Sequence, residues 1–241
     1  MLKIFWSKLL NMSIILRIDV DHPYNYKAIL GKIGNFLIFY VPFFPKFRIN
    51  YLENLENLLI LLNTHKIKSK IFFRRHTIPF NKSKILDLIK LGKHEICWHV
   101  DASNNFSVFK KEYEFICNKL KIKIRAFSKH GSGKLNKKLG YYHCPEYNEL
   151  NLINWGNQLK LKEFYGNGEN PSVYEIKENG LKIFSNAFWI DKKYRSEKYN
   201  LNWLLKESKK RDIVLLIHPE DIIKKENYKY LVNIISSDNY E

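Results

Sequence analysis

The chain has 241 residues, of which 45% are hydrophobic and 15% are aromatic, a composition that supports a folded core and excludes a disordered chain. Its 41 lysines and arginines outnumber 24 acidic residues, giving a formal charge of +17. Such a balance favours anionic partners, namely nucleic acid, a phospholipid surface or a phosphate-bearing substrate. The lysines are spread along the chain, however, which is also typical of ordinary solvated faces. No segment reaches the roughly 20 apolar residues that a membrane-spanning helix needs.

Cysteine usage and the amino terminus bear on the compartment. The three cysteines, Cys97, Cys117 and Cys144, are odd in number and widely spaced, so neither a disulfide framework nor a zinc knuckle is expected. Residues 1–16 are apolar but lack a continuous apolar run and a small-residue cleavage site. We therefore expect a cytoplasmic protein.

Strand-like and helix-like segments alternate along the chain. Most strands are short apolar runs, and the helices place apolar residues three and four apart. In chain order the sequence predicts strand 14–21, helix 51–65, strand 70–77, helix 81–91, strand 94–101, helix 107–120, strand 124–131, a short strand 141–145, strand 181–189, helix 200–210, strand 212–219 and helix 226–236. Repeated strand–helix units imply parallel strands with helices outside. The predicted fold is an α/β, distorted (β/α) barrel, built as one domain over residues 1–241.

One segment is too long for a simple barrel connection. Residues 22–50 separate the first strand from its helix, whereas such loops usually have about 2–6 residues. Residues 36–44 form an unbroken apolar run flanked by Lys32, Lys46 and Arg48. We interpret 22–50 as an insertion that packs on the barrel as a lid or hairpin. The alternative is a patch that enters an anionic membrane surface.

Polar residues gather where the predicted strands end. In a parallel barrel the carboxyl-terminal ends of the strands carry the chemistry. The ends hold Asp19 and Asp21; Arg74 and Arg75; His99; Lys129 and His130; and His218.

Two carboxylates on one buried strand require compensation. Asp19 and Asp21 are two residues apart and therefore point the same way. Buried carboxylates are costly unless they are paired or bind a metal. A divalent ion held by carboxylate and imidazole would satisfy them. The alternative is an ion pair with an arginine, for which Arg17, Arg74 and Arg75 are candidates, and His99 could equally be a core histidine.

Four segments together resemble a known family. They are residues 17–21 (RIDVD), 92–99 (GKHEICWH), 127–131 (FSKHG) and 215–218 (LLIH). In order and spacing they are similar to the motifs of the polysaccharide deacetylase family, the NodB-type carbohydrate esterases of family 4. The closest likeness is to divergent members found with O-antigen and capsule biosynthesis genes.

The resemblance implies a distorted β/α barrel and metal-assisted removal of an acetyl group from an amino-sugar. By the same resemblance Asp19 is the base, Asp21 and His99 bind the metal, for which zinc is expected, and His218 is the general acid. Ser103 stands where the family has its second metal histidine. His130 is our candidate for the third ligand, with Asp101 as the alternative.

Substrate and partner expectations follow from these assignments. A sugar, or a nucleotide- or lipid-linked sugar, would meet Arg74, Arg75 and Lys129 through an anionic group, and Trp98 would contribute a binding surface. The same barrel could instead perform another acyl or amide transfer on a sugar, or bind carbohydrate without catalysis. Nucleic-acid binding is not favoured, because no nucleic-acid motif accompanies the charge. An anionic membrane, contacted from the cytoplasmic side, is the alternative partner of residues 36–44.

Overall fold

The computed structural model describes residues 14–25, 28–40, 46, 49–101, 105–130, 149–172, 176–178 and 180–236. Its centre is one sheet of nine strands in the order β6-β7-β5-β4-β3-β2-β1-β9-β8. The strands are β1 (Ile14–Val20), β2 (Lys70–Phe73), β3 (Glu95–Val100), β4 (Ala126–Lys129), β5 (Glu163–Gly168), β6 (Ile176–Glu178), β7 (Leu181–Asn186), β8 (Phe188–Trp189) and β9 (Ile213–Ile217).

Eight of these strands form a nearly closed parallel barrel. Every neighbouring pair from β7 round to β8 is parallel, and only the short β6 pairs antiparallel, on β7. β7 and β8 lie at opposite ends of the parallel order, yet Ala187 alone separates them in sequence. The two edges of the sheet are therefore brought together by the chain itself. The prediction of an α/β barrel is confirmed.

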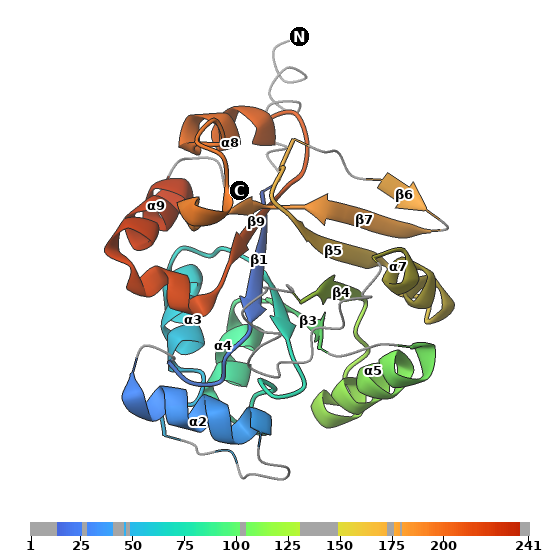
Figure 1. The fold of residues 1–241 in the computed structure, drawn as a ribbon. Coiled ribbons are helices and arrows are strands. Elements are labelled where there is room, and N and C mark those ends of the chain that lie inside the picture. The colour runs from blue at the N-terminus through green and yellow to red at the C-terminus, as the bar shows by residue number, and fades with distance from the viewer. Residues whose placement is uncertain are drawn as a thin grey trace.

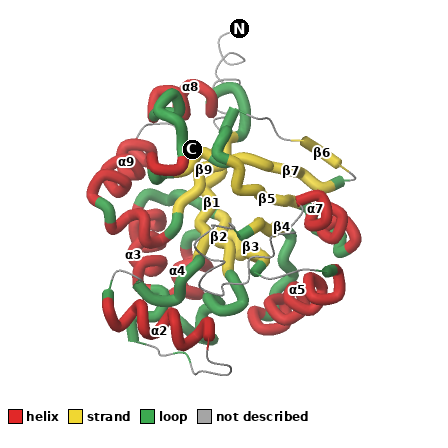
Figure 2. Tube along the Cα trace, in the orientation of Figure 1, coloured by secondary structure: helices red, strands yellow, loops and turns green. Residues whose placement is uncertain are grey.

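Helices surround the strands (Figures 1 and 2). They are α2 (Ile29–Tyr40), α3 (Glu53–Thr64), α4 (Lys84–Leu91), α5 (Phe106–Leu120), α7 (Glu149–Gln158), α8 (Leu201–Ser208) and α9 (Lys225–Ser236), with 3-10 turns η1 (Lys192–Tyr194) and η2 (Pro219–Ile223). Among the described residues, no helix is long and apolar enough to cross a membrane.

Alternation along β1 separates two cores. Leu16, Ile18 and Val20 face outward and pack with α3, α4, α8 and α9. Arg17 and Asp19 face the barrel interior. The middle of that interior is apolar and holds Phe72, Cys97, Ala126, Tyr165, Phe184, Ala187, Val214 and Leu216. A third cluster packs β3, β4, β5 and β7 against α5 and α7. The strand pattern thus places the two β1 polar residues inside the barrel.

The structure departs from the predicted elements in three places. The long insertion contains a helix, α2, and not a hairpin, and this helix approaches the preceding loop closely at Gly31 and Gly34. The strand predicted over 181–189 is divided into β7 and β8. β5 and α7 were not predicted at all. The short strand predicted at 141–145, Cys144, Ser103 and most of residues 41–48 lie outside the described residues.

Candidate functional site

The carboxyl-terminal edge of the barrel gathers the polar residues that follow its strands. Asp21 comes directly after β1, His99 lies near the end of β3, and His130 comes directly after β4. β3 and β4 are parallel neighbours, with His99 opposite Ser128 of β4, and β2 lies between β3 and β1. His218 follows β9, the other neighbour of β1. One edge of the sheet therefore collects residues that are 197 positions apart between Asp21 and His218.

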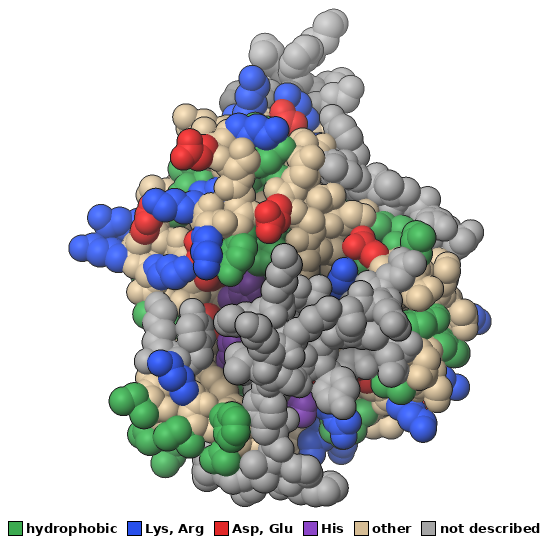
Figure 3. Space-filling view, viewed as in Figure 1, with side chains coloured by type: hydrophobic (Ala, Val, Ile, Leu, Met, Phe, Trp, Pro, Cys, Tyr) green, Lys and Arg blue, Asp and Glu red, His purple; other side chains and the backbone are tan. Residues whose placement is uncertain are grey.

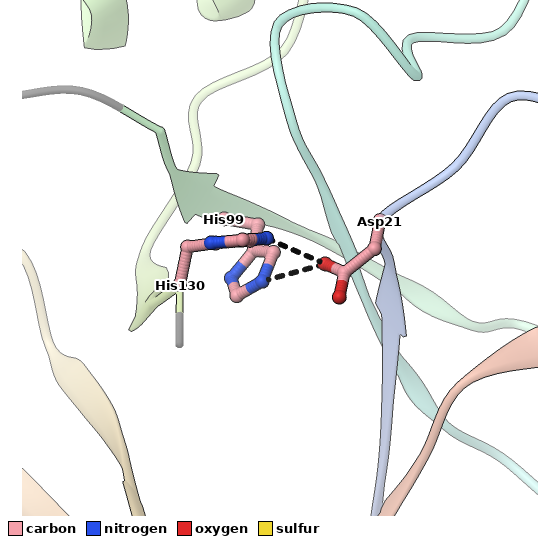
Figure 4. Close-up of side chains that lie close together, drawn as sticks. All are labelled: Asp21, His99 and His130. Atoms are coloured by element: carbon pink, nitrogen blue, oxygen red, sulfur yellow. Dashed lines mark ion pairs between the residues drawn. The ribbon is translucent and has the colours of Figure 1, made fainter. Parts of the chain in front are cut away.

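Asp21, His99 and His130 form the densest group. Each offers one ligand atom, and these atoms lie within 4.8 Å of one another. Asp21 Oδ1 is 3.1 Å from His99 Nε2 and 3.4 Å from His130 Nε2, so both rings point at the same oxygen (Figure 4). His99 Nδ1 lies 2.6 Å from the Ser128 hydroxyl, which fixes the ring with Nε2 turned to Asp21.

The chemistry of this group fits a divalent cation. Asp21 Oδ1 is buried and accepts no well-directed hydrogen bond from the described residues. Burial alone would raise the pKa of the Asp21 carboxyl, but His130, His218 and His99 lower it well below its usual range. Burial and the charge of Arg74 lower the pKa of His130, which keeps that imidazole in the neutral, coordinating form. A carboxylate with two imidazoles is a donor set that Zn²⁺ accepts.

Asp19 is held by an arginine from its own strand. Arg17 Nε lies 2.8 Å from Asp19 Oδ1, and Arg17 Nη2 lies 2.5 Å from Oδ2. The remaining guanidinium nitrogen donates to the Gly166 carbonyl at 2.6 Å, and Asn167 Oδ1 accepts from Nη2 at 2.7 Å. Arg17 is fully buried. Of the alternatives that the sequence left open, the arginine pair is therefore realised for Asp19, and its partner is Arg17.

This pair does not remove Asp19 from the site. Asp19 Oδ2 is 3.6 Å from His99 Nε2, and Asp19 lines the same pocket as Asp21. A bidentate guanidinium stabilises the charged carboxylate and fixes its orientation. Asp19 therefore faces the group formed by Asp21, His99 and His130, the metal-type cluster, in a fixed orientation.

His218 lies between two carboxylates. Its Nε2 is 3.4 Å from Asp21 Oδ2, and its Nδ1 is 3.3 Å from Asp221 Oδ2. Burial alone would lower the pKa of His218, but Asp21 and Asp221 raise it well above its usual value. The ring is consequently a protonated imidazolium at neutral pH, and Trp189 lies beside it with ring centroids 5.8 Å apart.

These groups open onto a cavity of about 740 Å³. Among the described residues, its lining has seven acidic residues and three lysines, although the whole chain is strongly basic. They are Asp19, Asp21, Glu149, Glu169, Asp191, Glu220 and Asp221 against Lys129, Lys193 and Lys224. Burial raises the pKa of Glu220 to about 7. The positive charge of the chain is thus carried elsewhere, and the pocket itself suits cations and neutral polar groups.

Three predicted substrate-binding residues do not line this cavity. Trp98 is fully buried beneath α5, and its indole donates to Glu112. Arg74 forms an ion pair with Asp101, and Asp101 is therefore not part of the metal-type cluster. Arg75 is exposed and lies over the Phe115 ring at 4.7 Å. Trp98 points outward because it alternates with His99 on β3, which faces inward. Lys129 is the one predicted cationic residue that lines the cavity.

Sequence reasoning did not assign Asp221 to the site. Glu220 and Asp221 follow His218 and Pro219, and a short acidic turn after the last histidine was the available signal. Trp189 ends β8, a two-residue strand that no alternation pattern reveals.

Comparison with known proteins gives a likeness in fold. Neither a family model nor a curated protein matches the chain. Among solved structures, the chain is similar to BA3943, a CE4 family pseudoenzyme from Bacillus anthracis, with 11% identity, a TM-score of 0.46, and 97% of this chain and 63% of that chain covered. It is also similar to the Xyl-CE4 domain of a multidomain xylanase from the hindgut metagenome of Trinervitermes trinervoides, with 11% identity, a TM-score of 0.44, and 95% and 85% covered. The chain thus spans less than two thirds of the first of these proteins.

Proposed function

We propose that the protein is a metal-dependent hydrolase that removes an acyl group, most simply acetyl, from an amino-sugar. One observation carries the proposal: Asp21, His99 and His130 converge on a single point, with Asp19 on one side and a charged His218 on the other. All five line one cavity. A carboxylate and an imidazolium placed about a metal-type cluster are the groups that amide hydrolysis requires.

Asp21, His99 and His130 would hold the cation, and zinc is the metal we propose. When bound, such an ion polarises an acyl carbonyl and makes water a better nucleophile at neutral pH. Asp19 is the proposed base, because Arg17 fixes its orientation and its Oδ2 lies 3.6 Å from His99 Nε2. His218 is the proposed acid, because its two carboxylate neighbours keep a proton available for a departing amine. Amide cleavage needs both transfers, since an amine leaves only when protonated.

An amino-sugar suits the cavity. Its volume is of the order of ligand sites for small molecules. Trp189 lines it beside His218, and its indole Nε1 is buried without a hydrogen bond to the described residues. Sugars pack on aromatic faces and accept such donors. The motif resemblance adds the class of substrate, and we propose a cytoplasmic role in the synthesis of a surface polysaccharide.

The test is metal content and turnover in matched variants. Purified protein reconstituted with zinc is assayed for release of acetate from N-acetylated sugar oligomers. Asp19→Asn and His218→Gln are expected to lower turnover by about 10²–10⁴-fold with zinc retained. His99→Ala is expected to lose zinc, whereas the exposed-residue controls Asp87→Asn and His65→Ala behave as wild type. A wild-type protein that binds no divalent metal would contradict the proposal.

A second candidate is a carbohydrate-binding protein without catalysis. The observation that favours it is the bidentate pair with Arg17, which engages both carboxylate oxygens of Asp19. This protein would bind N-acetylated sugars in the cavity with equal affinity before and after chelator treatment. Sugar binding of that kind, together with no acetate release by zinc-loaded wild type, would select this candidate.

A further inference from the structure

Helix α2 presents its large apolar side chains to solvent. Ile29, Leu30, Ile33 and Phe36 are 76%, 83%, 50% and 55% exposed. Their spacing of one, three and four places them on one side of the helix. The space-filling view shows hydrophobic side chains gathered over α2 at the lower left (Figure 3). Soluble proteins normally turn such a face toward the core, so this face calls for an explanation.

The opposite side of α2 is the side that packs, and it consists of Gly31, Gly34, Asn35 and the buried Ile38. Asn35 is 4% exposed, and its amide exchanges two hydrogen bonds with the Tyr24 backbone, at 3.1 and 3.0 Å. A Cβ at Gly31 would lie 1.9 Å from the Asn25 carbonyl oxygen, and one at Gly34 would lie 2.8 Å from the Tyr24 ring. Only residues without a side chain allow this close approach.

These contacts fix the rotation of the helix. Turning the apolar side inward would bring Ile29 or Ile33 to positions where not even a methyl group fits, and it would leave the buried Asn35 amide and the Tyr24 backbone unpaired. The exposed apolar face is therefore built into the sequence of α2. A face of this kind marks an interaction surface.

We propose that the apolar face of α2 docks on an anionic lipid bilayer, with the helix lying in the plane of the interface. Charge selects this occupant. In sequence, residues 22–52 include four cationic residues and contain no acidic residue, although Lys46 is turned inward and donates to Tyr51 and to the Ile78 carbonyl. Lys32 is the one charged residue of α2 and is exposed. Exposed apolar residues beside cations are the composition of helices that bind anionic membrane surfaces.

The dimensions agree with a surface position. Twelve residues make a helix about 18 Å long, too short to span a bilayer of about 30 Å. α2 begins eight residues after Asp21, beyond the carboxyl-terminal end of β1 (Figure 1). Docking would thus bring a lipid surface to the end of the barrel where the cavity lies. The inference rests on α2 alone and does not depend on the proposed hydrolase activity.

Vesicle flotation of the full-length chain tests the inference. The probes are vesicles of phosphatidylcholine alone and vesicles of phosphatidylcholine mixed with an equal amount of phosphatidylglycerol. The wild type is expected to float with the anionic vesicles, less with the neutral ones, and to be released by salt. Leu30→Ser with Phe36→Ser should weaken anionic-vesicle binding by about tenfold or more. Lys32→Glu should weaken it by about fivefold and leave binding to neutral vesicles unchanged.

The matched control is Leu91→Ser with Leu150→Ser, which removes two equally exposed leucines from α4 and α7. It is expected to bind as wild type, and circular dichroism melting verifies that both double variants are folded. Binding that the α2 variant retains in full would overturn the inference and assign lipid contact to another segment. Absence of wild-type binding would also overturn it. If, in addition, the α2 variant converts a dimer to a monomer in sedimentation, the face belongs to a second copy of the chain.

Discussion

Both ends of the barrel interior carry acidic and basic side chains. At one end these side chains are paired with one another, whereas at the other end the pairing is incomplete. At the amino-terminal end, Lys70 Nζ pairs with Glu95 and lies 2.9 Å from Glu163 Oε2. Tyr165 donates to the same Glu163 oxygen at 2.7 Å. Burial alone would lower the pKa of Lys70, but the two glutamates raise it above its ordinary value. Both acids at this end contact the same cation, Lys70.

At the carboxyl-terminal end, the polar groups exceed what they can satisfy among themselves. Asp19 is neutralised by Arg17, but three imidazoles converge on Asp21, and its Oδ1 still accepts no well-directed hydrogen bond from the described residues. The apolar layer of Phe72, Cys97 and Tyr165 separates the two ends. Buried charge alone therefore does not indicate a site. Charged groups that are all paired can serve stability, whereas a buried charged atom without a hydrogen-bond partner is a place for a ligand.

Breaking the Arg17 pair should have the largest effect. Arg17→Met leaves the buried Asp19 carboxylate without its partner, so the free energy of unfolding should fall by about 3–5 kcal/mol. Urea denaturation measures the change. Arg125→Met, at an exposed arginine, should change it by less than about 0.5 kcal/mol. Adding Asp19→Leu to Arg17→Met should recover most of the loss, and an undiminished loss would show that Arg17 acts through packing instead.

Zinc should distinguish the two ends of the barrel. At a free concentration a hundred times its dissociation constant, zinc should raise the free energy of unfolding by about 2.7 kcal/mol, because only the folded chain presents the converged ligands. His99→Ala should abolish the gain. Glu95→Gln, which alters the other end, should keep it. A gain that persists in His99→Ala would place the zinc elsewhere in the chain.

Removing the cation at the amino-terminal end should cost much less than removing Arg17. Lys70→Met should lower the free energy of unfolding by about 1 kcal/mol or less, because the side chains of Glu95 and Glu163 are 42% and 27% exposed and water can solvate them. The same urea titration measures it. A loss as large as that of Arg17→Met would show that both ends of the barrel exclude water equally, and it would contradict the difference between them.

The smallest expected effect is a dependence on pH at His94. This ring precedes β3 and contacts Ser69 and Asn63, and burial lowers its pKa below the ordinary value of 6.5. The unfolded chain then binds more protons than the folded one near pH 6, so the stability from neutral His94 is present above pH 6.5 and is lost as pH falls through the folded pKa. Denaturation midpoints of wild type and His94→Gln should therefore converge on acidification, and midpoints that diverge would contradict this sign.

Local patterns predicted most of the barrel. β1, β2, β3, β4 and β9 were found because each is a short apolar run, and their helices because the apolar spacing is regular. α2 was not predicted as a helix, since a continuous apolar run has no helical period to detect. β5 was missed, and β7 and β8 were merged into one predicted strand. Short strands carry a weak signal, and β5 and β7 also contain glycine or asparagine.

The apolar runs of the sequence predict that Asp19, Asp21 and His99 stand near strand ends. Alternation along β1 and β3 predicts the side of the strand that each of them faces. Which of these residues contact one another depends on the tertiary structure. In the folded chain Asp19 pairs with Arg17, Asp101 pairs with Arg74, and Trp98 lies in the core beneath α5. His218, which comes from the far end of the sequence, lies beside Asp21. The reason is that strand order and register, set by packing over the whole sheet, fix distances between residues that no local pattern relates.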